Sequence, residues 1–408
     1  MPTPAAGSEL IAAITTGSEV TLRPVSTRSP SSPAPGLFNP AGTARYLRAS
    51  PLFAIGPAEP GPAIRRGFLI AVPIGVCLGI EFGFDAPTHG AIGTGALLAG
   101  FPAMDAPALP RAAWQAAAAA AIGIAAALGI LSSQSAPLAV LALGLLGAIS
   151  GYFFAYSLRL AIYGLSVSLA LMVAQGFFLP VDETIPALLW VTLGGLTQVS
   201  WSLLIWVFAE HRARGEPGGW DWGDVKAAFR SNLTLESDAF RHAIRFGTAL
   251  AVGVAVYRIF DMDDHGFWIP LTILFVMRPD RDQTYLRLVL RAAGTALGLL
   301  VATAAAETID NSDVAVVTIL FLAAGFAFGL LTVQYALFTA SITIYVVLLT
   351  DTLGENAWHA ADLRAIGTAV GILIAFLAWV LWPNPKLGRG LDFQALRAPP
   401  PASEPESR

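Results

Sequence analysis

The feature that most constrains this chain is a series of twelve apolar segments separated by short polar loops. Most of them approach the length of about 20 residues that a helix needs to cross a hydrocarbon core of about 30 Å. Charged residues make up only 13% of the chain, against about a quarter in soluble domains. The sequence therefore predicts an all-α polytopic membrane protein whose main partner is the lipid bilayer. Its net charge of −4 argues against a nucleic-acid partner.

The segments form two groups of six, and the chain divides accordingly. We expect two tandem six-helix transmembrane repeats at residues 61–209 and 241–383, joined by a cytosolic linker at 210–240. The linker contains an amphipathic stretch at 223–233 that is typical of a short helix at the membrane surface. Two further stretches, predicted as disordered cytosolic tails, are 1–60 and 384–408. The predicted membrane helices are 64–84, 89–104, 111–131, 137–156, 160–179, 186–208, 243–260, 265–277, 285–306, 314–331, 333–349 and 363–382.

The two groups share residue pairs at similar spacing, which indicates an internal repeat. Ile-Arg occurs at 64–65 and 244–245, and His-Gly occurs at 89–90 and 265–266. Six crossings return a chain to its starting side, so we expect the two copies to be parallel, related by an axis along the membrane normal. The interface between the copies is the natural place for a pathway.

The second segment of each group is unusually short. Residues 265–277 span about 20 Å at about 1.5 Å per residue, and we expect Pro270 to interrupt this helix. Its counterpart at 89–104 is rich in glycine. Short or interrupted helices at corresponding positions are typical of a transporter's binding site, although glycines can also serve only to let helices pack closely.

Two arginines stand inside apolar segments, where an ionisable group is a candidate for function. Arg291 and Arg364 each begin an Arg-x-x-Gly-Thr-x-x-Gly pattern. A guanidinium can bind a carboxylate through two parallel hydrogen bonds, or it can extend from a helix end to interfacial water. Arg291 is expected on the cytosolic side, which favours extension to interfacial water. Arg364 is expected on the outer side, against the positive-inside bias, and favours anion binding.

His89 and His265 begin the two short segments at the expected outer face. An imidazole there can carry protons in a proton-coupled exporter, or it can simply cap a helix. Glu81, near the outer end of the first predicted helix, is a weaker candidate for a proton relay.

Three further residues follow from the second short segment. Trp268 is interpreted either as an interfacial anchor or as a ring that stacks with an aromatic solute. Arg278 and Asp280 belong to a charged stretch that is expected at the cytosolic end of the segment. That stretch can recruit an anion, or it can be a solvated loop that pairs its own charges.

The sequence contains none of the common motifs of enzymes and cofactor sites. The chain has no phosphate-binding loop, no His-Glu-x-x-His and no Gly-x-Ser-x-Gly. Its five histidines show no spacing typical of a metal site. We therefore expect no cofactor, no metal and no enzymatic activity.

The second half resembles the fusaric-acid-resistance-like family of bacterial membrane proteins over residues 236–382. The resemblance rests on Arg241-His-Ala-Ile-Arg245, on His265-Gly-Phe-Trp268 and on the Arg-x-x-Gly-Thr run at Arg291. The first half keeps His89-Gly90 but lacks the Arg-x-x-Gly-Thr run in its third segment, which suggests a diverged copy. The family implies efflux of aromatic or other organic acids.

Together these features favour a secondary transporter that exports small organic anions, aromatic carboxylates foremost. The driving force is expected to be the proton gradient, with protons as the coupling ion, or the membrane potential. An organic-anion channel, a transporter of the major-facilitator type and a non-transporting membrane scaffold are the alternatives. The expected location is the bacterial inner membrane, and the sequence leaves the oligomeric state open.

The distribution of positive charge predicts the orientation. Placing both termini in the cytoplasm puts 22 of the 24 Lys and Arg residues on the cytosolic side, as expected for a membrane protein.

Labelling of single cysteines tests this orientation, because Cys77 is the chain's one native thiol. Asp182→Cys and Asp310→Cys, in predicted outer loops, should react with an impermeant maleimide on intact cells. Lys226→Cys, in the predicted cytosolic linker, should react only after permeabilisation. The reverse pattern would show that the orientation is inverted.

Overall fold

The computed structural model describes residues 59–84, 90–210, 222–262, 266–308, 313–352 and 357–382. The predicted disordered tails and the two histidines His89 and His265 lie outside the described residues, apart from the last residues of the first tail. Regular structure in these described ranges is entirely helical, as the sequence predicts. Each of the twelve predicted segments contains a helix.

The helices of the first half begin and end as follows. They are α3 (Pro60–Gly83), α4 (Ala91–Gly100), α5 (Ala108–Ser133), α6 (Ala136–Tyr152), α7 (Leu158–Gly176) and α8 (Thr184–Ile205). Three short turns adjoin them, namely η1 (Phe153–Ala155), η2 (Val181–Glu183) and η3 (Trp206–Glu210).

The second half repeats this order of elements after a linker helix. The linker helix is α9 (Trp222–Asn232), which confirms the predicted short helix. The helices that follow are α10 (Asp238–Ile259), α11 (Trp268–Val276), α12 (Arg281–Thr308), α13 (Asp313–Leu330), α14 (Tyr335–Thr352) and α15 (Ala357–Leu381).

Ten of these helices are long and apolar enough to cross a membrane, counted over the described residues. The exceptions among the twelve are α4, with 10 residues, and α11, with 9 residues. At about 1.5 Å per residue each reaches only about half of a 30 Å core. The prediction of a short second helix in each half is therefore confirmed.

Pro270 does not interrupt α11, contrary to the prediction. It lies in the first turn of the helix, which begins at Trp268. The amide groups of a first turn have no partner within the helix, so a proline there removes no hydrogen bond. The helix is short because it ends at Val276, before Met277 takes an extended conformation.

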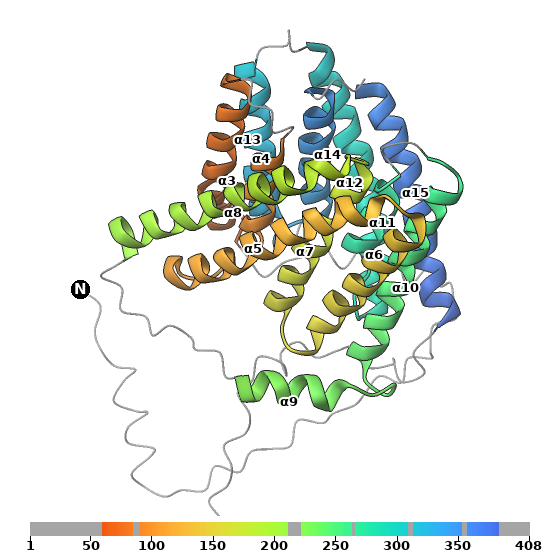
Figure 1. The fold of residues 1–408 in the computed structure, drawn as a ribbon. Coiled ribbons are helices and arrows are strands. Elements are labelled where there is room, and N and C mark those ends of the chain that lie inside the picture. Colours follow the sequence, from red (N-terminus) through yellow and green to blue (C-terminus); the bar gives the residue numbers. More distant parts are fainter. Residues whose placement is uncertain are drawn as a thin grey trace, which may run out of the picture. The chain divides into compact units, whose positions relative to one another are not determined.

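The first helix of each half packs against the fourth helix of the other half. α3 packs along α13, and α10 packs along α6 (Figure 1). This is the same pairing with the two halves exchanged. Within the halves, α4 packs on α8 as α11 packs on α15. These pairings agree with an internal repeat, which itself stays a prediction.

Glycines set the distance between these helices. Gly325 and Gly329 of α13 lie against Phe68 and Ile64 of α3, and Gly294 of α12 lies against α14. Small residues at such positions let the backbones of neighbouring helices approach closely. The most demanding position is Gly67, where an added Cβ would lie 2.3 Å from the Gly329 nitrogen.

Substitution of Gly67 tests this close approach. Gly67→Ala should lower the midpoint of thermal unfolding in detergent, because overpacking against backbone costs about 1–3 kcal/mol. Gly79→Ala is the matched control on the same helix, since a Cβ there meets nothing within 4 Å. The control should keep or raise the midpoint, as alanine favours a helix by about 1 kcal/mol. Equal midpoints for the two variants would contradict the packing.

Candidate functional site

Two arginines lie inside the helix bundle of the second half without a carboxylate partner. Arg291 of α12 and Arg364 of α15 are both 0% exposed. Neither forms an ion pair with any residue that the structure describes. The two guanidinium groups are close enough for their charges to repel. The interpretation of Arg291 as a residue that extends to interfacial water is therefore wrong.

Aromatic rings, rather than acids, cover these cations. The central guanidinium carbon of Arg364 lies 4.3 Å from the centroid of the Trp268 ring, and that of Arg291 lies 5.3 Å from the Phe275 ring. Trp268 is 1% exposed, so it is not an interfacial anchor. A ring face attracts a cation through its quadrupole but does not accept the N–H groups at the guanidinium edge as a carboxylate would.

Many hydrogen-bond donors in this region have no partner among the residues that the structure describes. By hydrogen-bond geometry they include all three guanidinium nitrogens of Arg291, although the Tyr335 hydroxyl lies near that group, and two of the three nitrogens of Arg364. The third nitrogen of Arg364 makes one long contact, 3.4 Å from the Thr343 hydroxyl. Three buried threonine hydroxyls also lack a hydrogen-bond partner. We call the residues that carry these groups the arginine cluster, and they are Arg291, Arg364, Thr295, Thr339 and Thr368.

The Arg-x-x-Gly-Thr pattern explains how the cluster forms. The glycine three residues after each arginine lies against a neighbouring helix, with Gly294 at Thr339 of α14 and Gly367 at Trp268 of α11. The threonine four residues after each arginine follows on the same helix face. Each pattern therefore brings helices together and directs an arginine and a hydroxyl to the same side. Buried donors of this kind normally have a hydrogen-bond acceptor, and a bound anion would provide one.

Further arginines lead from Arg278 to the cluster. Arg287, one turn before Arg291, lies 4.4 Å from the centroid of the Tyr335 ring. Arg278 lies 5.8 Å from the Phe154 ring and is only partly exposed. Its pKa is lowered to about 9 by burial and then by the charge of Arg287. Arg278 is therefore not in a solvated loop. We call Arg278, Arg287, Arg291 and Arg364 the arginine row.

Asp280 and two unpredicted residues lie near the Arg278 end of this row. Asp280 directly precedes α12. Arg245 lies 3.7 Å from the Trp379 ring centroid, and His242 is fully buried between Phe154 and Phe246 with both ring nitrogens lacking a hydrogen-bond partner. The spacing of Arg287 and Arg291, four residues apart on one helix face, was the available signal for Arg287. No comparable pattern marks His242.

Glu81 has a structural role in the first half. Its two carboxylate oxygens accept hydrogen bonds from the Ile92 amide at 2.9 Å and the Gly93 amide at 3.0 Å. These amides belong to the first turn of α4, whose N-terminus attracts negative charge. Gly90 precedes the helix with a φ of 76°, a conformation that favours glycine. Glu81 therefore fixes the start of the short helix.

No metal site accompanies these groups in the described part of the chain. There, no cluster of three His, Cys, Asp or Glu side chains can hold a metal ion. The donors of the arginine cluster are cationic or hydroxyl groups, which suit an anion instead.

Substitution of Glu81 separates its capping role from a proton relay. Glu81→Gln turns one acceptor into a donor that faces an N–H group, so we expect a loss of about 1–2 kcal/mol of stability. The unfolding midpoint should fall, whereas exposed Asp182→Asn should not change it. Unchanged stability together with an altered pH profile of solute transport would favour the relay.

Comparisons with known proteins found similar sequences and one matching family model. Inner membrane protein YccS of Escherichia coli K12 is 35% identical over 162 residues, 40% of this chain and 22% of YccS. Uncharacterized protein ORF2 of Neisseria gonorrhoeae is 33% identical over 167 residues, 38% of this chain and 37% of that protein. The chain thus covers well under half of either relative, and no solved structure matches it significantly. Residues 250–378, which include the whole arginine cluster, match the family model described as fusaric acid resistance protein-like, the family that the second half resembles in sequence.

Proposed function

We propose that this chain carries small organic anions, carboxylates foremost, across the bacterial inner membrane. The arginine cluster supports the proposal most directly. It holds two buried positive charges, no carboxylate partner among the described residues, and several donors without a hydrogen-bond partner. Buried charges in membrane helices are expensive and typically mark a solute or ion pathway. An anion between Arg291 and Arg364 would offset their repulsion and accept their free N–H groups.

The shape of the cluster favours a carboxylate with an aromatic body. A guanidinium presents parallel N–H groups that match the two oxygens of a carboxylate. The rings of Trp268 and Phe275 provide apolar walls beside the charges. An aromatic ring on the solute can pack against such walls with an offset or edge-to-face geometry.

The arginine row gives the proposed path its direction. In the predicted orientation, Arg278 lies at the cytosolic end and Arg364 lies nearer the outside. A cytosolic anion would meet Arg278 and Arg287 before it reached the cluster. A negative-inside potential then favours outward movement by about 2.3 kcal/mol per charge per 100 mV. The order of the arginines and the membrane potential therefore both favour export.

A carrier fits the burial of the cluster better than an open channel. Arg291 and Arg364 are both 0% exposed, so solvent does not reach them in this conformation. A carrier has such an occluded state between its two open states. An open channel would keep continuous access to water. The proposal assigns no catalytic role to any residue.

Transport by purified protein in liposomes tests the proposal. Arg364→Gln and Arg291→Gln should each lower benzoate transport by about tenfold to a hundredfold, because a hydrogen bond to a charged group contributes about 1.5–3 kcal/mol. Arg159→Gln is the control, since Arg159 is 40% exposed and pairs with Asp105. The control should transport normally.

Three outcomes would contradict the proposal or change its mechanism. Normal benzoate transport by both cluster variants would exclude the cluster as the binding site. Absence of transport by the unmodified protein, across a panel of aromatic and aliphatic carboxylates, would favour the scaffold alternative. Current without a coupling ion would replace the carrier with a channel.

A further inference from the structure

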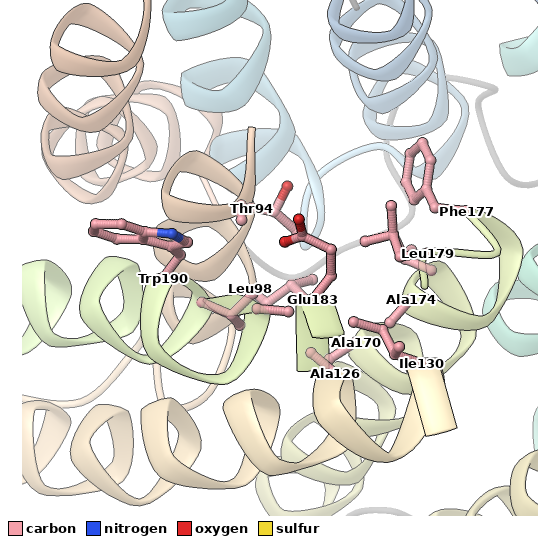
Figure 2. A pocket seen from close by; sticks show the side chains of 14 residues that line it. Thr94, Leu98, Ala126, Ile130, Ala170, Ala174, Phe177, Leu179, Glu183 and Trp190 are labelled. Atoms are coloured by element: carbon pink, nitrogen blue, oxygen red, sulfur yellow. The ribbon is translucent and has the colours of Figure 1, made fainter. Parts of the chain in front are cut away.

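We propose that the first half of the chain contains a second binding site, which takes a small organic ammonium ion with an aromatic or short aliphatic body. The site is a cavity between α4, α5, α7 and α8 (Figure 2). It is separate from the arginine cluster, and it does not depend on the transport function proposed above.

The cavity is largely apolar and has the size of one ring. Its volume is about 120 Å³. In another protein, an apolar cavity of about 150 Å³ stays dry and binds benzene. The wall consists mainly of small and aliphatic side chains, with two aromatic rings at the sides. Representative lining residues are Ala126, Ile130, Ala170, Ala174, Phe177 and Trp190.

Glu183 gives the cavity a negative charge. It is the one ionisable side chain among the lining residues, and in Figure 2 its carboxylate points into the cavity near Thr94. Glu183 stands at the N-terminus of α8, but its side chain does not cap that helix. Its carboxylate forms no hydrogen bond or ion pair with the described residues. A carboxylate beside apolar walls is stabilised by a cationic ligand.

The aromatic side chains fit the same ligand class. Trp190 and Phe177 lie on different sides of the Glu183 carboxylate in Figure 2. A ring face attracts an ammonium group, and it also packs against an aromatic ligand body. An organic anion would instead meet the Glu183 charge with no compensating cation among the lining residues.

The cavity occupies the place in the first half that the arginine cluster occupies in the second. A Cβ on Gly194 of α8 would lie 2.0 Å from the carbonyl oxygen of Ile92. A Cβ on Gly371 of α15 would lie 2.7 Å from the carbonyl oxygen of Ile269. These matching contacts set the correspondence between α4 with α8 and α11 with α15.

This correspondence suggests why a cavity opens at this place in the first half. Ala187 stands seven residues before Gly194, as Arg364 stands seven residues before Gly371. Ala91 directly precedes Ile92, as Trp268 directly precedes Ile269. The large Trp268 and Arg364 side chains fill the site of the second half, and alanines stand at both places in the first. The two halves therefore offer sites of opposite charge.

Calorimetric titration of the full chain in detergent tests the proposal with three probes of one size. Benzylamine should bind at least about tenfold more tightly than benzyl alcohol, because the ammonium group pairs with Glu183. Benzoate should not compete with benzylamine. Glu183→Gln should remove the preference for benzylamine over benzyl alcohol.

Two further variants locate the binding. Ala126→Leu should fill the cavity and abolish benzylamine binding, whereas Ala120→Leu, at an exposed position of the same helix, should leave it unchanged. If Ala126→Leu fails to fold, Ala187→Leu serves the same purpose. Arg364→Gln should retain benzylamine binding even where benzoate transport is lost, which separates this proposal from the transport function.

Several outcomes would overturn the proposal. Equal binding of benzylamine and benzyl alcohol, unaffected by Glu183→Gln, would reduce the cavity to an apolar void that takes lipid tails or detergent. If none of the three probes binds, the cavity is a gap in the packing and not a ligand site. Binding that survives Ala126→Leu and Ala187→Leu would place the ligand elsewhere.

Discussion

The burial of guanidinium charge without a carboxylate is the constraint on which the second half depends. Desolvation of a cation in a bilayer is costly, and a neighbouring acid would be the simplest compensation. The protein instead places Trp268 over Arg364 and Phe275 near Arg291. Ring faces offset part of the cost through their quadrupoles. An acid would offset more, but it would occupy the same N–H groups that an anion needs.

Close packing of helices makes this arrangement possible. The glycines Gly294 and Gly367 allow α12 to approach α14 and α15 to approach α11 at the level of the arginines. Because α11 has only 9 residues, it leaves room at its ends within the thickness of a membrane. The first half holds its own short helix with polar groups. Glu81 accepts from the first turn of α4, and Gln198 donates to the carbonyl groups of Ile70 and Ala96.

The sequence could predict the helices but not the environment of their polar residues. Segment length and apolar composition predicted the segments in which the described residues form six helices of each half, and the brevity of the second helix in each half followed from the same counting. Segment length and composition could not predict whether Arg291 is exposed to water. Its interpretation depended on where α12 begins, and α12 begins at Arg281, which places Arg291 in the third turn. Nor could spacing reveal that Phe275 covers it, since that contact joins two helices.

The cavity of the first half could not be predicted from the sequence either, because it depends on which residue types stand on two neighbouring helices. Trp190 of α8 stands four residues before Gly194, at the place of Gly367 in α15. The second half has a tryptophan on the short helix and a glycine on its partner, and the first half has an alanine on the short helix and a tryptophan on its partner. At these corresponding places, each pair of helices therefore carries one tryptophan. Only the arginine has no replacement, because Ala187 stands at its place. The missing side-chain volume cannot be recognised from one helix alone, since the two residues that face each other lie on different helices. The physical effect of the sequence differences between the two halves is therefore seen only when contacts between helices are compared.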